Sequence, residues 1–104
     1  MASLTELQNI AITIREQFRD FESAQRCEPW SRKDLVLGFI GDVGALAKLT
    51  MAADGVRSIP DYHEKLGHEM ADCLWSLLVL AREYKVDLEG EFMRMTGDLS
   101  SKLP

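Results

Sequence analysis

The stretch that most constrains how this chain folds runs from Glu69 to Ala81. No Pro or Gly interrupts it, and most of its residues favour helix. Of the twelve residues from Met70 to Ala81, ten are apolar and only Asp72 and Ser76 are polar. A helix that is apolar nearly all round is packed on several sides. We therefore expect Asp72 to be shielded from open water.

Glu69 lies three residues before Asp72 and so projects from the same helix face. A buried carboxylate must be paired, neutralised or bound to a metal. Two carboxylates on adjacent turns repel each other and favour a shared cation. On the residues alone, a metal site and a salt-bridged structural pair are equally good interpretations.

A second helix, roughly residues 32–53 with Ser31 as N-cap, is unusually apolar. From Leu35 to Ala53 its polar side chains are Asp42, Lys48 and Thr50. This approaches membrane-spanning length, but a central Asp argues for a packed soluble helix instead. Asp42, like Asp72, is thus a carboxylate in an apolar helix.

Three glycines lie three residues apart in the same helix: Gly38, Gly41 and Gly44. Each costs about 1 kcal/mol relative to Ala in a helix interior. The usual compensation is close approach of another helix backbone, which we expect here.

The remaining segments also read as helices. The first begins at a capping box, Ser3 to Glu6, and repeats apolar residues at helical spacing: Leu7, Ile10, Ile14, Phe18 and Phe21. Its other face, which includes Arg15, is expected to be solvated. The third helix spans about residues 62–84, with Asp61 and Glu64 as a capping box, and Asp87 caps a fourth. We predict an all-α fold, a single domain over residues 1–104 built as an antiparallel bundle of about four helices.

Composition limits the partners. A chain of 104 residues with 46% hydrophobic residues and two helices apolar on several sides cannot cover its core alone, so we expect a homodimer or homotetramer. The net charge of −5 argues against nucleic-acid or anionic-membrane binding. The first ten residues lack the pattern of a signal peptide, and Cys27 and Cys73 read as buried free thiols, so we expect a cytoplasmic protein.

Two motifs carry a resemblance to a known family. The run from Gly41 to Ala47, followed by Glu69-Met-Ala-Asp72, resembles the MazG-like branch of the all-α NTP pyrophosphohydrolases over roughly residues 30–99. The resemblance implies that NTP and water become NMP and pyrophosphate, with possible house-cleaning of non-standard or surplus nucleotides. It also implies Mg²⁺, with Mn²⁺ as the alternative, held by Asp42, Glu69 and Asp72, of which Glu69 and Asp72 are the catalytic pair.

The chain departs from the family pattern of Glu-x-x-Glu on one helix and Glu-x-x-Asp on the next. Asp42 replaces the first Glu and Ala45 replaces the second, so the carboxylate set is incomplete. The alternative function is therefore a catalytically weak or inactive relative that acts as a nucleotide-binding or protein-interaction dimer. A plain helical interaction module is a third.

Three further residues are candidates for substrate binding. Trp30 occupies a place where some relatives stack a base, although a plug on the core is the commoner role. Lys48 and Arg94 are candidate phosphate contacts, although Lys48 also suits a surface position. The C-terminal residues Asp98 and Lys102 match the family ending only loosely.

Overall fold

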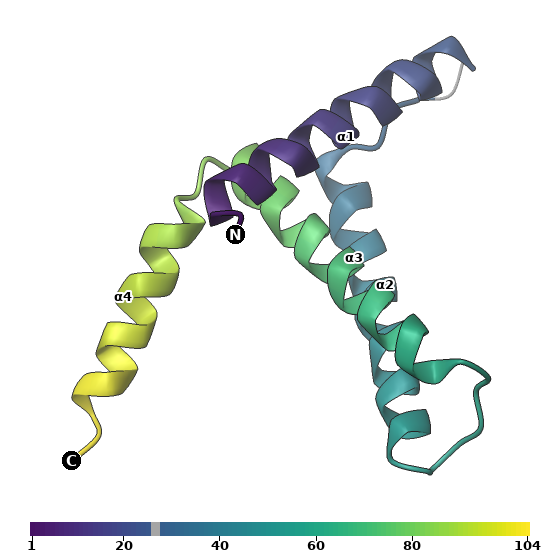
Figure 1. Ribbon diagram of the computed structural model, residues 1–104. Coiled ribbons are helices and arrows are strands. Elements are labelled where there is room, and N and C mark those ends of the chain that lie inside the picture. The colour runs from purple at the N-terminus through teal and green to yellow at the C-terminus, as the bar shows by residue number, and fades with distance from the viewer. Residues whose placement is uncertain (26–27) are drawn as a thin grey trace.

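The computed structural model describes residues 1–25 and 28–104, and this part of the chain contains four α-helices and no strand (Figure 1). They are α1 (Leu4–Ala24), α2 (Arg32–Ala53), α3 (Tyr62–Glu83) and α4 (Leu88–Ser101). The predicted all-α class and helix number are confirmed. Cys27 lies outside the described residues.

Local capping explains where most of these helices begin. Ser3 and Ser31 each accept a hydrogen bond from the backbone N–H three residues later in complete capping boxes, and Asp87 accepts one from the backbone N–H of Gly90 at 3.1 Å. The predicted cap at Asp61 is wrong. Asp61 has a left-handed backbone (φ 54°), whereas an N-cap needs extended backbone, and its side chain makes no cap hydrogen bond.

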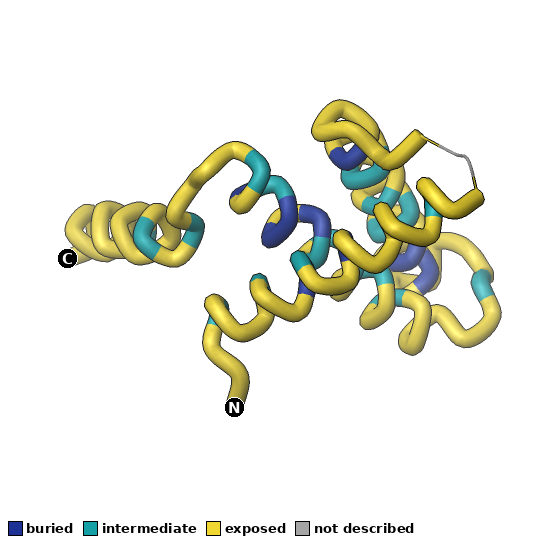
Figure 2. Tube along the Cα trace, turned by 90° about the horizontal axis from the view of Figure 1, so that it is seen from above, coloured by how far each residue is buried: buried dark blue, intermediate teal, exposed yellow. Residues whose placement is uncertain are grey.

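Helices α2 and α3 form an antiparallel hairpin, α1 crosses the upper end of α3, and α4 extends away from the other three (Figure 1). Most of the buried residues lie where α1, α2 and α3 meet, while Leu49 and Ala52 are buried near the end of α2 (Figure 2). Their central cluster consists of Ala11, Leu35, Leu78 and Val79. The core is therefore small and lies at one end of the hairpin.

Much of the apolar surface is left uncovered by this arrangement. The accessible surface is 7950 Å², against about 5,900 Å² for a compact monomer of this mass. The radius of gyration of 16.6 Å likewise exceeds the roughly 13 Å of a compact domain of about 100 residues. In a single chain, α3 is packed on fewer sides than expected, since Leu74 and Leu77 are each 42% exposed.

Helix α2 is the one helix of the described residues that is long and apolar enough to cross a membrane, with a mean hydropathy of 1.6 over its most apolar stretch. Core helices of soluble proteins pass the same test. Among the described residues, no other helix backbone lies close to the glycines of α2. A Cβ on Gly38 would meet the ring of Trp30 instead, and nothing lies within 4 Å of one on Gly41 or Gly44.

The first helix buries a different face from the one its apolar residues predict. Phe18 and Phe21 are 55% and 61% exposed, whereas Arg15 is only 5% exposed, so the predicted solvated position of Arg15 is wrong. Ala11 is buried beside Arg15, and the half-buried Gln8 donates a hydrogen bond from its side-chain amide to the carbonyl of Leu78 at 3.1 Å. Polar bonds to α3 and to the α1–α2 link therefore help to set how α1 docks.

Candidate metal centre

The antiparallel pairing of α2 and α3 brings three carboxylates together. Asp42 lies midway along α2, and Glu69 and Asp72 lie one turn apart on α3. One donor oxygen from each lies within 4.8 Å of the other two, the only such group found among the described residues. Hard oxygen donors at this spacing are the ligands that Mg²⁺ and Mn²⁺ prefer.

Of the three carboxylates, Glu69 has the least favourable environment for a negative charge. Its Oε2 atom is buried and has no hydrogen-bond partner among the described residues. Burial raises the pKa of the Glu69 carboxyl, and the negative charges of Asp42 and Asp72 raise it further. A carboxylate that lacks a hydrogen-bond partner and is repelled by two neighbouring negative charges is stabilised by a cation. The three oxygen donors therefore suit a divalent metal ion.

Asp72 is more exposed than the sequence predicts, with 40% of its side chain accessible. Its Oδ2 lies 3.4 Å from Nε2 of His68, one turn earlier on α3. In a single chain Asp72 is therefore only partly shielded from water, less than the sequence predicts.

Cys73 adjoins the cluster without joining it. It is a half-buried free thiol, and burial raises its pKa, helped by the three carboxylates. A thiol with a raised pKa stays protonated at neutral pH and is a poor metal ligand.

The other candidates are more scattered. Ala45, half-buried one turn after Asp42 on α2, offers no ligand. Lys48 is exposed further along α2. Arg94 pairs with Glu91 on α4, which extends away from the hairpin, so in one chain it does not lie beside the carboxylates (Figure 1).

Trp30 does lie close to the cluster. A cavity of about 320 Å³ is bordered by Trp30 together with two of the carboxylates, Asp42 and Asp72. Phe18 and Trp75 also line it. Trp30 is 47% exposed, so it covers Gly38 on α2 without being a buried core plug.

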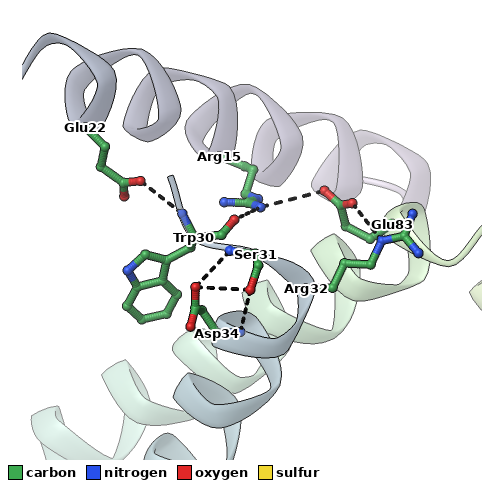
Figure 3. Close-up of polar contacts among 7 residues, drawn as sticks. All are labelled: Arg15, Glu22, Trp30, Ser31, Arg32, Asp34 and Glu83. Atoms are coloured by element: carbon green, nitrogen blue, oxygen red, sulfur yellow. Dashed lines mark hydrogen bonds and ion pairs between the residues drawn. The ribbon is translucent and has the colours of Figure 1, made fainter. Parts of the chain in front are cut away.

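The backbone of Trp30 is held on both sides (Figure 3). Its N–H donates to Oε2 of Glu22 at 3.2 Å, and its carbonyl accepts from a terminal nitrogen of Arg15 at 2.6 Å. Arg15 also faces Glu83 at 3.8 Å, and Glu83 faces Arg32 at 3.6 Å. These contacts tie the start of α2 to α1 and to the end of α3.

Comparisons with protein-family models, curated proteins and solved structures give no match for this chain. The functional argument therefore rests on the residues of the site. Sequence reasoning missed Phe18, which lines the cavity, and Arg15, which donates to the carbonyl of Trp30. The available signal was the helical spacing of Gln8, Ala11 and Arg15, a stripe of polar and small residues beside the apolar one.

Proposed function

We propose that this chain is a Mg²⁺-dependent nucleoside triphosphate pyrophosphohydrolase, converting NTP and water to NMP and pyrophosphate, with non-standard or surplus nucleotides as natural substrates. The observation that carries the proposal is the convergence of Asp42, Glu69 and Asp72 within 4.8 Å. These are the positions at which the sequence resembles the carboxylate motifs of the MazG-like enzymes.

The donor set suits the metal that this chemistry needs. Mg²⁺ keeps several waters and takes its remaining ligands from one or two carboxylates and from substrate phosphates, so three carboxylates suffice. Mn²⁺ suits the same oxygens. When bound, such a metal neutralises charge on the phosphates and lowers the pKa of water.

The three carboxylates have separate roles in this proposal. Asp42 holds the metal from α2, while Glu69 and Asp72 hold it from α3 and accept hydrogen bonds from water in the site. The aromatic residues beside Asp42 and Asp72 border the place for a base. Lys48, exposed on α2, is the remaining candidate for a phosphate contact from the same chain.

One observation favours a second candidate function. Ala45 supplies no ligand at the position of the second family Glu, which leaves the site without a fourth carboxylate. The alternative is a catalytically weak or inactive relative that binds nucleotides or protein partners as a dimer.

The test is pyrophosphate release from a panel of ribo- and deoxyribonucleoside triphosphates with Mg²⁺ or Mn²⁺. Wild type is compared with Glu69→Gln, with Ala45→Glu, and with Glu16→Gln as a control on the exposed surface of α1. Turnover that is lost in Glu69→Gln and kept in Glu16→Gln supports the hydrolase. Activity only in Ala45→Glu supports the degenerate relative, and turnover unaffected by Glu69→Gln refutes the role of the cluster.

We also propose that the chain works as a homodimer or homotetramer. The surface exceeds that of a compact monomer by about 2,000 Å², as much as obligate interfaces bury. Apolar side chains on α4 and α2 remain open, among them Phe92, Met95, Leu99, Leu37 and Ile40, each more than half exposed. Light scattering in detergent-free buffer tests this, and a stable, folded monomer at micromolar concentration would refute it.

A further inference from the structure

The hairpin of α2 and α3 has an apolar face on the side away from the carboxylates, which we call the back face. Its large side chains are each between 37% and 60% exposed: Val36, Ile40 and Val43 on α2, and Met70, Leu74 and Leu77 on α3. Successive residues turn by about 100° around a helix axis. The α2 members therefore lie about 100–160° around the axis from Asp42, and the α3 members about 140–160° from Asp72.

Both stripes of the back face have the spacing of helices that pack in bundles. The steps are four and then three residues, from Val36 to Val43 on α2 and from Met70 to Leu77 on α3. This spacing makes a straight apolar seam along each helix. A four-helix bundle buries one such seam from each of its helices. The hairpin therefore presents two of the four seams that a bundle needs.

The back face is also free of charge. Between residues 35 and 53, and between residues 70 and 81, the charged side chains are Asp42, Lys48 and Asp72. None of these belongs to either stripe. Two copies of the face can therefore meet without like-charge repulsion across the contact, although each chain carries a net charge of −5.

The size of the back face matches what a stable dimer buries. Helices α2 and α3 have 22 residues each, so the face is about 30 Å long and two helix diameters, or about 20 Å, wide. This outline of roughly 600 Å² approaches the 800 Å² or so that each partner buries in a standard interface. The apolar stripe of α4 runs along one helix of 14 residues and covers only about 200 Å², too little for a stable contact by itself.

We infer that two copies of this chain pack through their back faces, so that α2 and α3 of each copy form one four-helix bundle. The contact is two-fold, with the same patch on both copies. Each carboxylate cluster then lies on an outer side of the bundle, away from the contact. The inference rests on the self-association proposed above and does not depend on hydrolysis.

The test is sedimentation equilibrium of the full chain without metal or nucleotide. Leu74→Glu and Leu74→Lys place a charge in the middle of the α3 stripe, and circular dichroism checks that each variant keeps its helix content. Phe92→Glu is the matched control, because Phe92 on α4 is 56% exposed and lies outside the back face. An equimolar mixture of the two Leu74 variants is measured as well.

We expect wild type to associate and each Leu74 variant to raise the dissociation constant of the dimer by more than about 100-fold, since two leucines leave the contact and two unpaired charges enter it. Mixing the two variants restores association, because opposite charges then meet, and Phe92→Glu still forms at least a dimer. A monomeric wild type, an unchanged dissociation constant in Leu74→Glu, or no recovery on mixing overturns the inference.

Dissociation by Phe92→Glu but not by Leu74→Glu also overturns it, while self-association itself stands. If the variants behave as expected but wild type releases no pyrophosphate from any NTP, the back-face contact stands and the proposed hydrolase falls.

Discussion

Replacing Glu69 with Gln should stabilise the metal-free protein. The pKa of Glu69 is raised above its ordinary value of 4.5 in the folded state, by burial first and then by Asp42 and Asp72. Between the ordinary pKa of a Glu carboxyl and the raised pKa of folded Glu69, the folded state binds more protons than the unfolded state. Stability therefore falls as pH rises through that window. Above it the full cost of the buried charge is present, and Glu69→Gln removes it.

The structure sets the size of this effect. Two unit charges no more than 4.8 Å apart repel by at least about 1 kcal/mol in water and at least about 3 kcal/mol at an effective dielectric constant of about 20. Asp72 is 40% exposed, which keeps its pair with Glu69 near the lower value. Removing the charge from two such pairs yields about 2 kcal/mol, or a rise in melting temperature of roughly 10 °C for a chain of this size.

Added Mg²⁺ should make wild type more stable than Glu69→Gln, which is the reverse of the order expected without metal. A ligand at about 100 times its Kd stabilises the folded state by about 2.7 kcal/mol, and Glu69→Gln should lose most of this gain. The assay is thermal unfolding at about pH 8, where free carboxylates are ionised, with and without Mg²⁺. Glu16→Gln is the control and should change stability by less than about 0.5 kcal/mol. A lower melting temperature for metal-free Glu69→Gln, or equal gains from Mg²⁺ in both proteins, would refute the reasoning.

Four substitutions that test backbone and capping effects can be checked by urea unfolding. Gly38→Ala places a Cβ 2.8 Å from the Trp30 ring and should cost about 1–2 kcal/mol, whereas Gly41→Ala meets no atom within 4 Å and should stabilise the monomer by about 1 kcal/mol. Asp87→Ala removes the N-cap of α4 and should cost about 1 kcal/mol, with faster amide exchange in α4. Asp61→Gly relieves a left-handed backbone without losing a cap bond and should stabilise by up to about 1 kcal/mol. A change in the free energy of unfolding with the opposite sign, at any of these positions, would contradict the argument made for that position.

Local signals were enough to predict much of the fold. The bounds of α2 follow from Ser31 as the cap and from Gly55, whose positive φ of 77° ends the helix region. The grouping of Asp42 with Glu69 and Asp72 was implied by the family resemblance, and the antiparallel pairing of α2 and α3 brings the three side chains together. Asp61 was mispredicted because the sequence motif does not reveal its left-handed backbone, in which the side chain makes no cap hydrogen bond.

The docking of α1 could not be predicted from its apolar pattern. The repeat that includes Phe18 and Phe21 indicated one buried face, but Arg15 lies in the interface and those side chains remain more than half exposed. Burial of Arg15 depends on a carbonyl before α2 and a carboxylate at the end of α3, contacts that only the folded chain brings together. A single-helix pattern carries no information about such partners.

The carboxylate cluster and the aromatic cavity beside it depend on the same register of α2 against α3. Leu35, Gly38 and Asp42 recur at helical spacing on one face of α2, as do Asp72, Trp75 and Val79 on α3. A shift of α2 by one residue would turn that face by about 100° and separate Asp42 from Glu69 and Gly38 from Trp30 together. The contacts of Arg15, Glu22 and Glu83 around Trp30 and Arg32 oppose that shift, since they fasten the first residues of α2 to two other helices. The carboxylate cluster and the aromatic cavity thus depend on the position of one helix, and substitutions that loosen Trp30 should weaken the stabilisation by added Mg²⁺ that the proposed function predicts.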